Sequence, residues 1–121
     1  MAPASPAPST PTAAEILSAR YRSRLPASLE ELDGPEHGTV TLPLHVVWSG
    51  LRTYDLDRPR SRMSLYRTVL AEGQRDDLVA YLNTDLLTSQ WPVLRTLISR
   101  NVRDVWENAF LTLRPATTSA A

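Results

Sequence analysis

The chain has no cysteine and no lysine among its 121 residues, and only one phenylalanine. The absence of cysteine excludes disulfides, thiolate nucleophiles and cysteine-ligated zinc, and it fits a reducing compartment. No apolar run approaches the roughly 18 residues that a transmembrane helix needs. The N-terminal segment has neither the basic region nor the apolar stretch of a secretory signal. We therefore expect a cytoplasmic protein that does not bind a membrane.

Charges of the two signs balance, with 13 basic and 13 acidic residues and a formal net charge of zero. A protein that binds nucleic acid without sequence specificity usually presents a net basic surface, because neutralising phosphates drives its affinity. Neutrality disfavours that class, although charge can still gather locally. Every basic residue is arginine, which together with the abundant alanine and proline is typical of a GC-rich genome.

Both ends of the chain have compositions that disfavour folding. Residues 1–11 contain four prolines and no large apolar side chain, so they bury too little surface to offset their ordering entropy. Residues 114–121 are similarly small and polar. We predict disordered tails over these two ranges and a single, mostly helical domain over residues 12–113.

The first half of that domain carries clear signals for helix ends. Thr12 and Glu15 have the spacing of a capping box, and Pro26 should end the helix that follows. A second box begins at Ser28 and predicts one or two turns. Asp57 is the expected N-cap of a later helix.

The second half of the domain is helical by apolar periodicity. The predicted segments are a helix closed by Gly73, a helix over 74–82, a helix from Asp85 that Pro92 kinks or splits, and a helix over 101–112. The expected core consists of Leu70, Leu78, Leu82, Leu87, Trp91, Leu94, Val105, Trp106 and Phe110.

Residues 39–47 are the one good strand signal, with apolar and polar residues alternating. Pro43 cannot donate to a ladder, so the strand should lie at an edge. It could pair with residues near 51–55, pair with a second subunit in a homodimer, or lie extended across the helices. The predicted fold class is mainly α, with four to five short helices in one small domain and one flanking edge β-strand or short hairpin.

The segment 52–67 is locally basic, with five arginines against two aspartates. Guanidinium groups bind phosphates, carboxylates and acidic surfaces, and tryptophan and arginine are frequent interface hot spots. The alternative interpretation is the solvated side of an amphipathic helix. The candidate interaction residues are Trp48, Arg52, Tyr54, Arg58, Arg60, Arg62 and Arg67.

Two patterns could support metal chemistry. Asp55 and Asp57 form a DxD pair that could share a divalent cation, but no glycine-rich phosphate loop accompanies them, and a turn followed by a helix N-cap explains them equally. Acidic residues and histidines also gather at Asp33, Glu36, His37 and His45, without the spacing of a known metal motif. We therefore expect no catalytic residues, no metal and no cofactor.

The runs DLDRPRSRMSLYRTVLAEG, DDLVAYLNTDLL and QWPVLRTLISRNVRDVWENAF resemble small uncharacterised proteins of actinobacteria, Streptomyces and its relatives. The resemblance covers about residues 39–111. Some similar proteins are encoded beside a nucleotidyltransferase-like toxin gene. The resemblance therefore implies a partner-binding or antitoxin role, and it supplies no catalytic residues.

We predict a non-enzymatic protein-interaction or accessory module, antitoxin-like, that binds a protein partner through the strand edge, Trp48 and the segment 52–67. The first alternative is a DNA-binding transcriptional regulator with arginines on phosphates. One version of this regulator would bind DNA through a helix-turn-helix over residues 74–98. The sequence supports that motif only weakly, because its second helix begins with an acidic residue and contains Pro92. The second alternative is a metal-dependent enzyme that uses Asp55 and Asp57.

Overall fold

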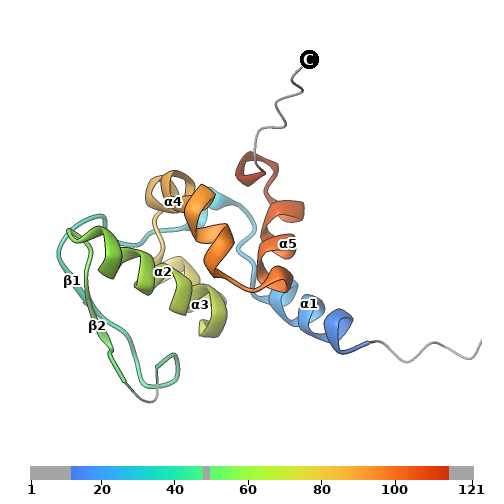
Figure 1. The fold of residues 1–121 in the computed structure, drawn as a ribbon, viewed down its shortest axis with the longest axis horizontal. Helices are drawn as coiled ribbons and strands as arrows, with labels where there is room; N and C mark the ends of the chain where they lie inside the picture. The colour runs from blue at the N-terminus through green and yellow to red at the C-terminus, as the bar shows by residue number, and fades with distance from the viewer. Residues whose placement is uncertain (1–11, 48–49, 115–121) are drawn as a thin grey trace, which may run out of the picture.

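A computed structural model describes residues 12–47 and 50–114 of the chain. The two predicted tails, apart from Arg114, lie outside the described residues, and so does Trp48. Figure 1 shows the elements in the order α1 (Ala13–Arg24), η1 (Leu29–Glu31), β1 (Thr39–Thr41), β2 (Thr53–Asp55), α2 (Pro59–Glu72), α3 (Arg75–Tyr81), α4 (Thr84–Leu97), α5 (Arg100–Ala109) and η2 (Leu111–Leu113), where η marks a 3-10 turn. The predicted fold class, a small, mainly α domain with a short hairpin, is confirmed.

The predicted start and end of the first helix are confirmed. Thr12 Oγ1 accepts the Glu15 N–H at 3.1 Å, and the Glu15 carboxylate accepts the Thr12 N–H at 3.2 Å. The helix ends before Pro26. The carboxylate of Glu31 then accepts the Ser28 N–H at 3.1 Å and closes the short η1 turn.

The strand prediction was too long. Only Thr39–Thr41 is strand, and residues 44–46 form a turn, because the carbonyl of Pro43 accepts the N–H groups of Val46 and Val47 at 3.0 and 3.1 Å. β1 pairs antiparallel with β2, and Val40 lies opposite Tyr54. Of the three pairings left open, the strand therefore pairs with the residues near 51–55.

Two helix predictions also need correction. Arg58, not Asp57, is the N-cap residue of α2, because the Asp57 carboxylate bonds instead to the imidazole of His37. Of the two alternatives at Pro92, a split helix is wrong, because α4 is one helix from Thr84 to Leu97, whereas a kink stays a prediction. Leu87 and Leu94, on the helical turns before and after the proline, are both buried in the core. The free energy gained by this packing outweighs the loss of the one helical hydrogen bond that the proline removes.

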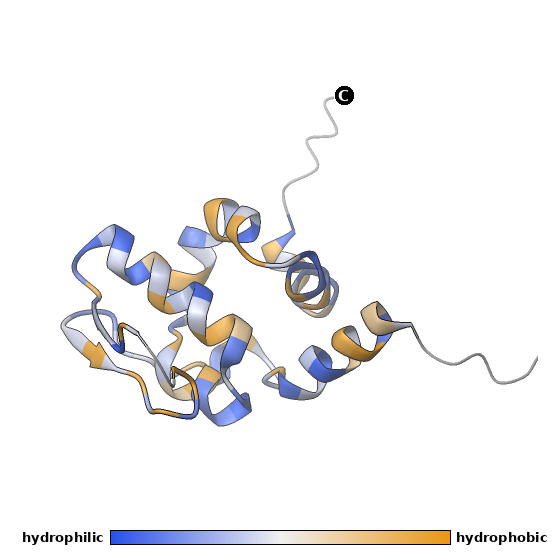
Figure 2. Ribbon diagram, turned by 60° about the horizontal axis from the view of Figure 1, so that its bottom comes forward, coloured by the Kyte–Doolittle hydropathy of each residue, from blue (hydrophilic) through white to orange (hydrophobic). Residues whose placement is uncertain are grey.

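The core joins α2, α3, α4 and α5, with the hairpin packed against α2. In Figure 2 each helix contains both apolar and polar residues. Eight of the nine predicted core residues are buried and Phe110 is partly buried. Trp106 lies between Trp91 and Phe110, with ring centroids 6.5 and 5.4 Å away, in tilted arrangements that aromatic rings favour.

Backbone contacts between the segment after η1 and the end of α3 join the two halves of the domain. The N–H groups of Asp33 and Gly34 donate to Val79 O and Leu82 O, both at 2.8 Å. A Cβ on Gly34 would lie 2.4 Å from the backbone carbon of Tyr81, so any other residue would force the backbone to shift there. None of the described helices is long and apolar enough to cross a membrane.

Candidate functional site

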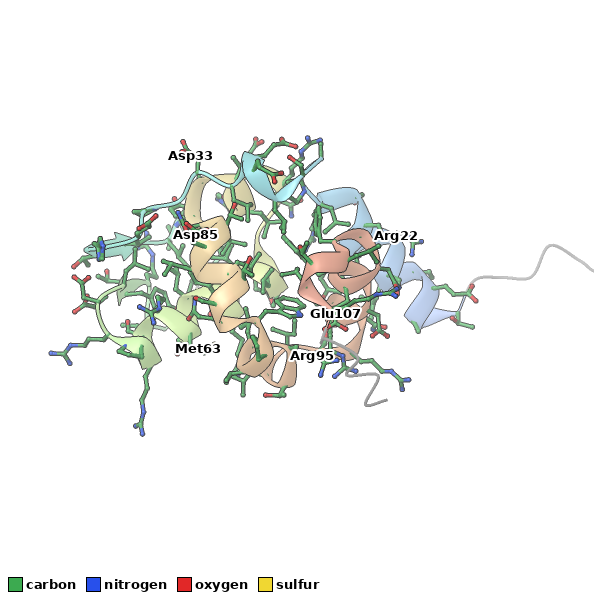
Figure 3. All side chains as sticks on the ribbon, turned by 90° about the horizontal axis from the view of Figure 1, so that it is seen from above. Arg22, Asp33, Met63, Asp85, Arg95 and Glu107 are labelled. Atoms are coloured by element: carbon green, nitrogen blue, oxygen red, sulfur yellow. The ribbon has the colours of Figure 1, made fainter. Side chains whose placement is uncertain are left out.

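Three of the predicted interaction residues present exposed guanidinium groups. Arg58 precedes α2, and Arg60 and Arg67 lie on its outer side, where Ser64 falls between them at helical spacing. We call Arg58, Arg60, Ser64 and Arg67 the arginine face. In Figure 3 long, nitrogen-tipped side chains project outward from the part of α2 near Met63.

The positive charge of the arginine face is poorly compensated. Arg58 Nε lies 3.5 Å from Asp55 Oδ2, and the arginine side chain is 81% exposed, so this pair contributes little. Arg60 and Arg67 form no ion pair with any described residue. Two guanidinium groups on one helix side are therefore available to an external anion.

The other described candidates turn inward and stabilise the hairpin. Arg52 Nε donates to Leu42 O at 3.0 Å. Tyr54 is only 5% exposed, because it lies on the core side of β2. Arg62 Nη1 donates to Leu56 O at 3.2 Å, and its Nε is buried and has no hydrogen-bond partner among the described residues. These three side chains do not extend the arginine face, and the one remaining predicted residue, Trp48, lies outside the described residues.

The two aspartates of the DxD pair make separate local contacts. Asp55 Oδ1 accepts the Asp57 N–H at 2.9 Å. The Asp57 carboxylate accepts the Gly38 N–H at 3.3 Å and lies 3.1 Å from His37 Nδ1. The hydrogen bond from His37, followed by that from Gly38, lowers the pKa of Asp57 below its usual range. Asp57 thus holds the base of the hairpin.

The second histidine has a different carboxylate partner. His45 Nε2 lies 2.9 Å from both oxygens of Asp77, which also accepts the Gln74 N–H at the start of α3. This contact ties the turn after β1 to α3. Among residues 12–47 and 50–114, no three His, Cys, Asp or Glu side chains gather in a way that could hold a metal ion.

A buried carboxylate between α4 and α5 is the feature that sequence reasoning missed. Glu107 is 8% exposed, and its Oε2 accepts Trp91 Nε1–H at 2.9 Å and Arg95 Nε–H at 2.7 Å. Figure 3 shows Arg95 and Glu107 beside each other. Burial alone would raise the pKa of Glu107, but the hydrogen bonds from Arg95 and Trp91 outweigh it and lower the pKa. The only sequence signal was a glutamate bordering an apolar stripe.

A cleft of about 370 Å³ opens next to this ion pair. From α4 it is lined by Thr88, Trp91, Pro92 and Arg95, and from the end of the domain by Thr112, Leu113 and Arg114. None of the described residues that line it is acidic. Arg114 Nε donates to the main-chain oxygen of Glu107 at 3.2 Å, and its Nη2 donates to Asn108 Oδ1 at 2.8 Å.

The helix pair α3–α4 has few exposed basic groups on α4 that could bind a phosphate backbone. The single arginine of α4 is Arg95, and its guanidinium is engaged by Glu107. The α4 residues that face solvent are mainly hydroxyl-bearing, apolar or acidic, such as Thr88, Val93 and Asp85. A recognition helix needs exposed polar or basic groups that reach bases and phosphates. The arginine face on α2 is the better anion-binding surface.

Comparisons with protein-family models, with curated proteins and with solved structures found no match to this chain.

Proposed function

We propose that the protein is a non-enzymatic interaction module whose arginine face binds an acidic surface of a protein partner. The observation that carries this proposal is the pair Arg60 and Arg67, which are exposed on one side of α2 and lack carboxylate partners among the described residues. Arginine forks form bidentate hydrogen bonds with carboxylates and lose little rotational freedom when they do so.

A protein partner is favoured over nucleic acid by the amount of charge. Each phosphate contact releases counterions, so a duplex-binding surface needs many cations to hold affinity at physiological salt. The arginine face has three guanidinium groups, one of them beside Asp55, on a chain whose net charge is zero. That number suits a complementary protein surface, where a few arginines can act as hot spots.

The resemblance to actinobacterial proteins encoded beside toxin genes makes the proposal more specific. In this form the module is a cytoplasmic, antitoxin-like neutraliser that covers an acidic region of its partner. A rigid helix surface suits that role, because the guanidinium groups are held at fixed spacing before binding. Core residues Tyr66, Val69 and Leu70 anchor the opposite side of α2.

The test is capture of partners from a nuclease-treated lysate of the host, with the double variant Arg60→Gln/Arg67→Gln. The matched control is Arg20→Gln/Arg100→Gln, which removes the same charge from α1 and α5. We expect one stoichiometric protein whose capture falls about tenfold or more in the first variant and is unchanged in the second.

Two outcomes would overturn the proposal. Equal capture by both double variants would mean that the arginine face is not the contact. Binding that appears only before nuclease treatment, with an affinity for duplex that falls steeply with salt, would support the DNA-binding alternative instead.

A further inference from the structure

Arg114, which follows η2, forms no ion pair with any described carboxylate. Arg114 donates to a main-chain carbonyl and to the side-chain amide of Asn108, which are both neutral acceptors. The nearby carboxylate of Glu107 already accepts from Trp91 and from Arg95. Among the described residues, the two guanidinium groups and the one carboxylate at this cleft therefore leave one net positive charge.

The walls of the cleft combine this charge with apolar surface. Pro92 and Leu113 contribute aliphatic surface and Trp91 contributes part of an indole, whereas Thr88 and Thr112 contribute hydroxyl groups. Its volume of about 370 Å³ lies near the lower end of small-molecule sites, roughly 300–1,000 Å³. A site of this size accepts a ligand with a small ring or a short chain.

We propose that this cleft binds a small monocarboxylate with an apolar body, whose carboxylate pairs with Arg114 and whose body rests between Pro92 and Leu113. A planar carboxylate matches the fork of a guanidinium group better than a single-point anion does. One excess positive charge suits a monoanion. A multiply charged phosphate would leave negative charge uncompensated against the apolar walls.

The cleft is also preorganised. Glu107 fixes the guanidinium group of Arg95 through two hydrogen bonds, from Nε at 2.7 Å and from Nη2 at 3.4 Å. The same carboxylate accepts the indole N–H and so fixes the ring of Trp91. Little side-chain entropy is then lost when a ligand enters. The cleft and the arginine face lie on different elements, so this site does not depend on the proposed function.

The experiment titrates the full-length protein with benzoate and follows the ¹H–¹⁵N signals of the Trp91 indole and of the Arg95 and Arg114 Nε–H groups. Benzamide is the neutral control with the same ring, acetate is the control without an apolar body, and inorganic phosphate is the multiply charged control. For benzoate we expect a dissociation constant on the order of 1 mM, as suits a ligand of few atoms. Each control ligand should bind at least tenfold more weakly.

Variants separate the proposed contact from non-specific anion binding. Arg114→Gln should weaken benzoate binding at least tenfold, Arg114→Lys should retain part of it, and Arg100→Gln should leave it unchanged. Thermal unfolding of each variant checks that the fold persists. The proposal is overturned if benzoate shifts none of the three signals, if benzamide or phosphate binds as well as benzoate, or if Arg114→Gln binds like the unchanged protein.

Discussion

Arginines between α4 and α5 and arginines on α2 have different roles in this protein. Between α4 and α5, the Arg95 side chain is 29% exposed and its guanidinium is held by the buried carboxylate of Glu107. On α2, Arg60 and Arg67 face solvent without a described carboxylate partner. The difference comes from the surroundings, because the guanidinium group is the same. Arg95 stabilises the fold because a carboxylate is buried beside it, whereas Arg60 and Arg67 remain available for binding because no described carboxylate pairs with them.

The largest effect on stability is expected from a substitution in the core between α4 and α5. Trp106→Ala deletes a ring that is 2% exposed and lies between Trp91 and Phe110. We expect the free energy of unfolding to fall by about 3–5 kcal/mol, because the ring leaves a cavity that its neighbours cannot fill. Urea denaturation followed by far-ultraviolet circular dichroism measures it. A loss below about 1 kcal/mol would mean that this region is loosely packed.

The next test asks whether the two regions unfold as one unit. Gly34→Ala places a Cβ 2.4 Å from the backbone of Tyr81, and backbone atoms cannot move aside as a flexible side chain can. We expect a loss of about 1–3 kcal/mol. Hydrogen exchange should show amides of α2 and of α5 losing protection together. Loss of protection confined to α3 and the segment after η1 would show that the regions are independent.

A third test addresses the ion pair itself. Glu107→Gln keeps the size of the side chain but removes the charge that holds Arg95, and we expect a loss of about 2 kcal/mol at neutral pH. Thermal and urea unfolding at pH 7 measure it. Arg100→Gln is the control, because Arg100 is 84% exposed and lies 3.8 Å from Asp104. An unchanged stability in Glu107→Gln would mean that the pair adds nothing to the fold.

The same variant predicts a pH dependence. The pKa of Glu107 is lowered in the folded state, so its contribution is fully present above the ordinary value of 4.5 and is lost as the pH falls through the folded value. The stability difference between the unchanged protein and Glu107→Gln should therefore be constant from pH 7 to about pH 5 and shrink at more acidic pH. A difference that stays constant into the acid range would exclude the carboxylate as its cause.

Substitutions on the arginine face are expected to have the smallest effect on stability. Arg60→Gln/Arg67→Gln should change the free energy of unfolding by less than about 0.5 kcal/mol, because exposed side chains away from contacts contribute little. The same variant should lose most of the partner binding. A clear loss of stability would instead mean that these arginines serve the fold, and the contrast with Arg95 would disappear.

Much of the helical structure follows from short-range patterns. The capping box at Thr12 lies within four residues of chain, and Pro26 acts on its immediate neighbours. The apolar periodicity around Trp91 and Trp106 placed both rings in the core. Strand length was harder to predict, because the turn after β1 depends on carbonyl geometry at Pro43 rather than on the alternation of apolar residues.

The sequence by itself determined the number and approximate limits of the helices, the burial of Trp91 and Trp106, and the balance of charge. Only the tertiary structure decided which charges remain exposed. Asp57 does not cap α2 as expected, because its carboxylate pairs with His37, which is 20 residues away in sequence. Glu107 accepts a hydrogen bond from Trp91, which is 16 residues away. Helix signals depend on neighbours three or four residues apart, whereas the partner of a charged group depends on which distant segments pack together. The arginine face and the cleft at Arg114 are consequences of that packing.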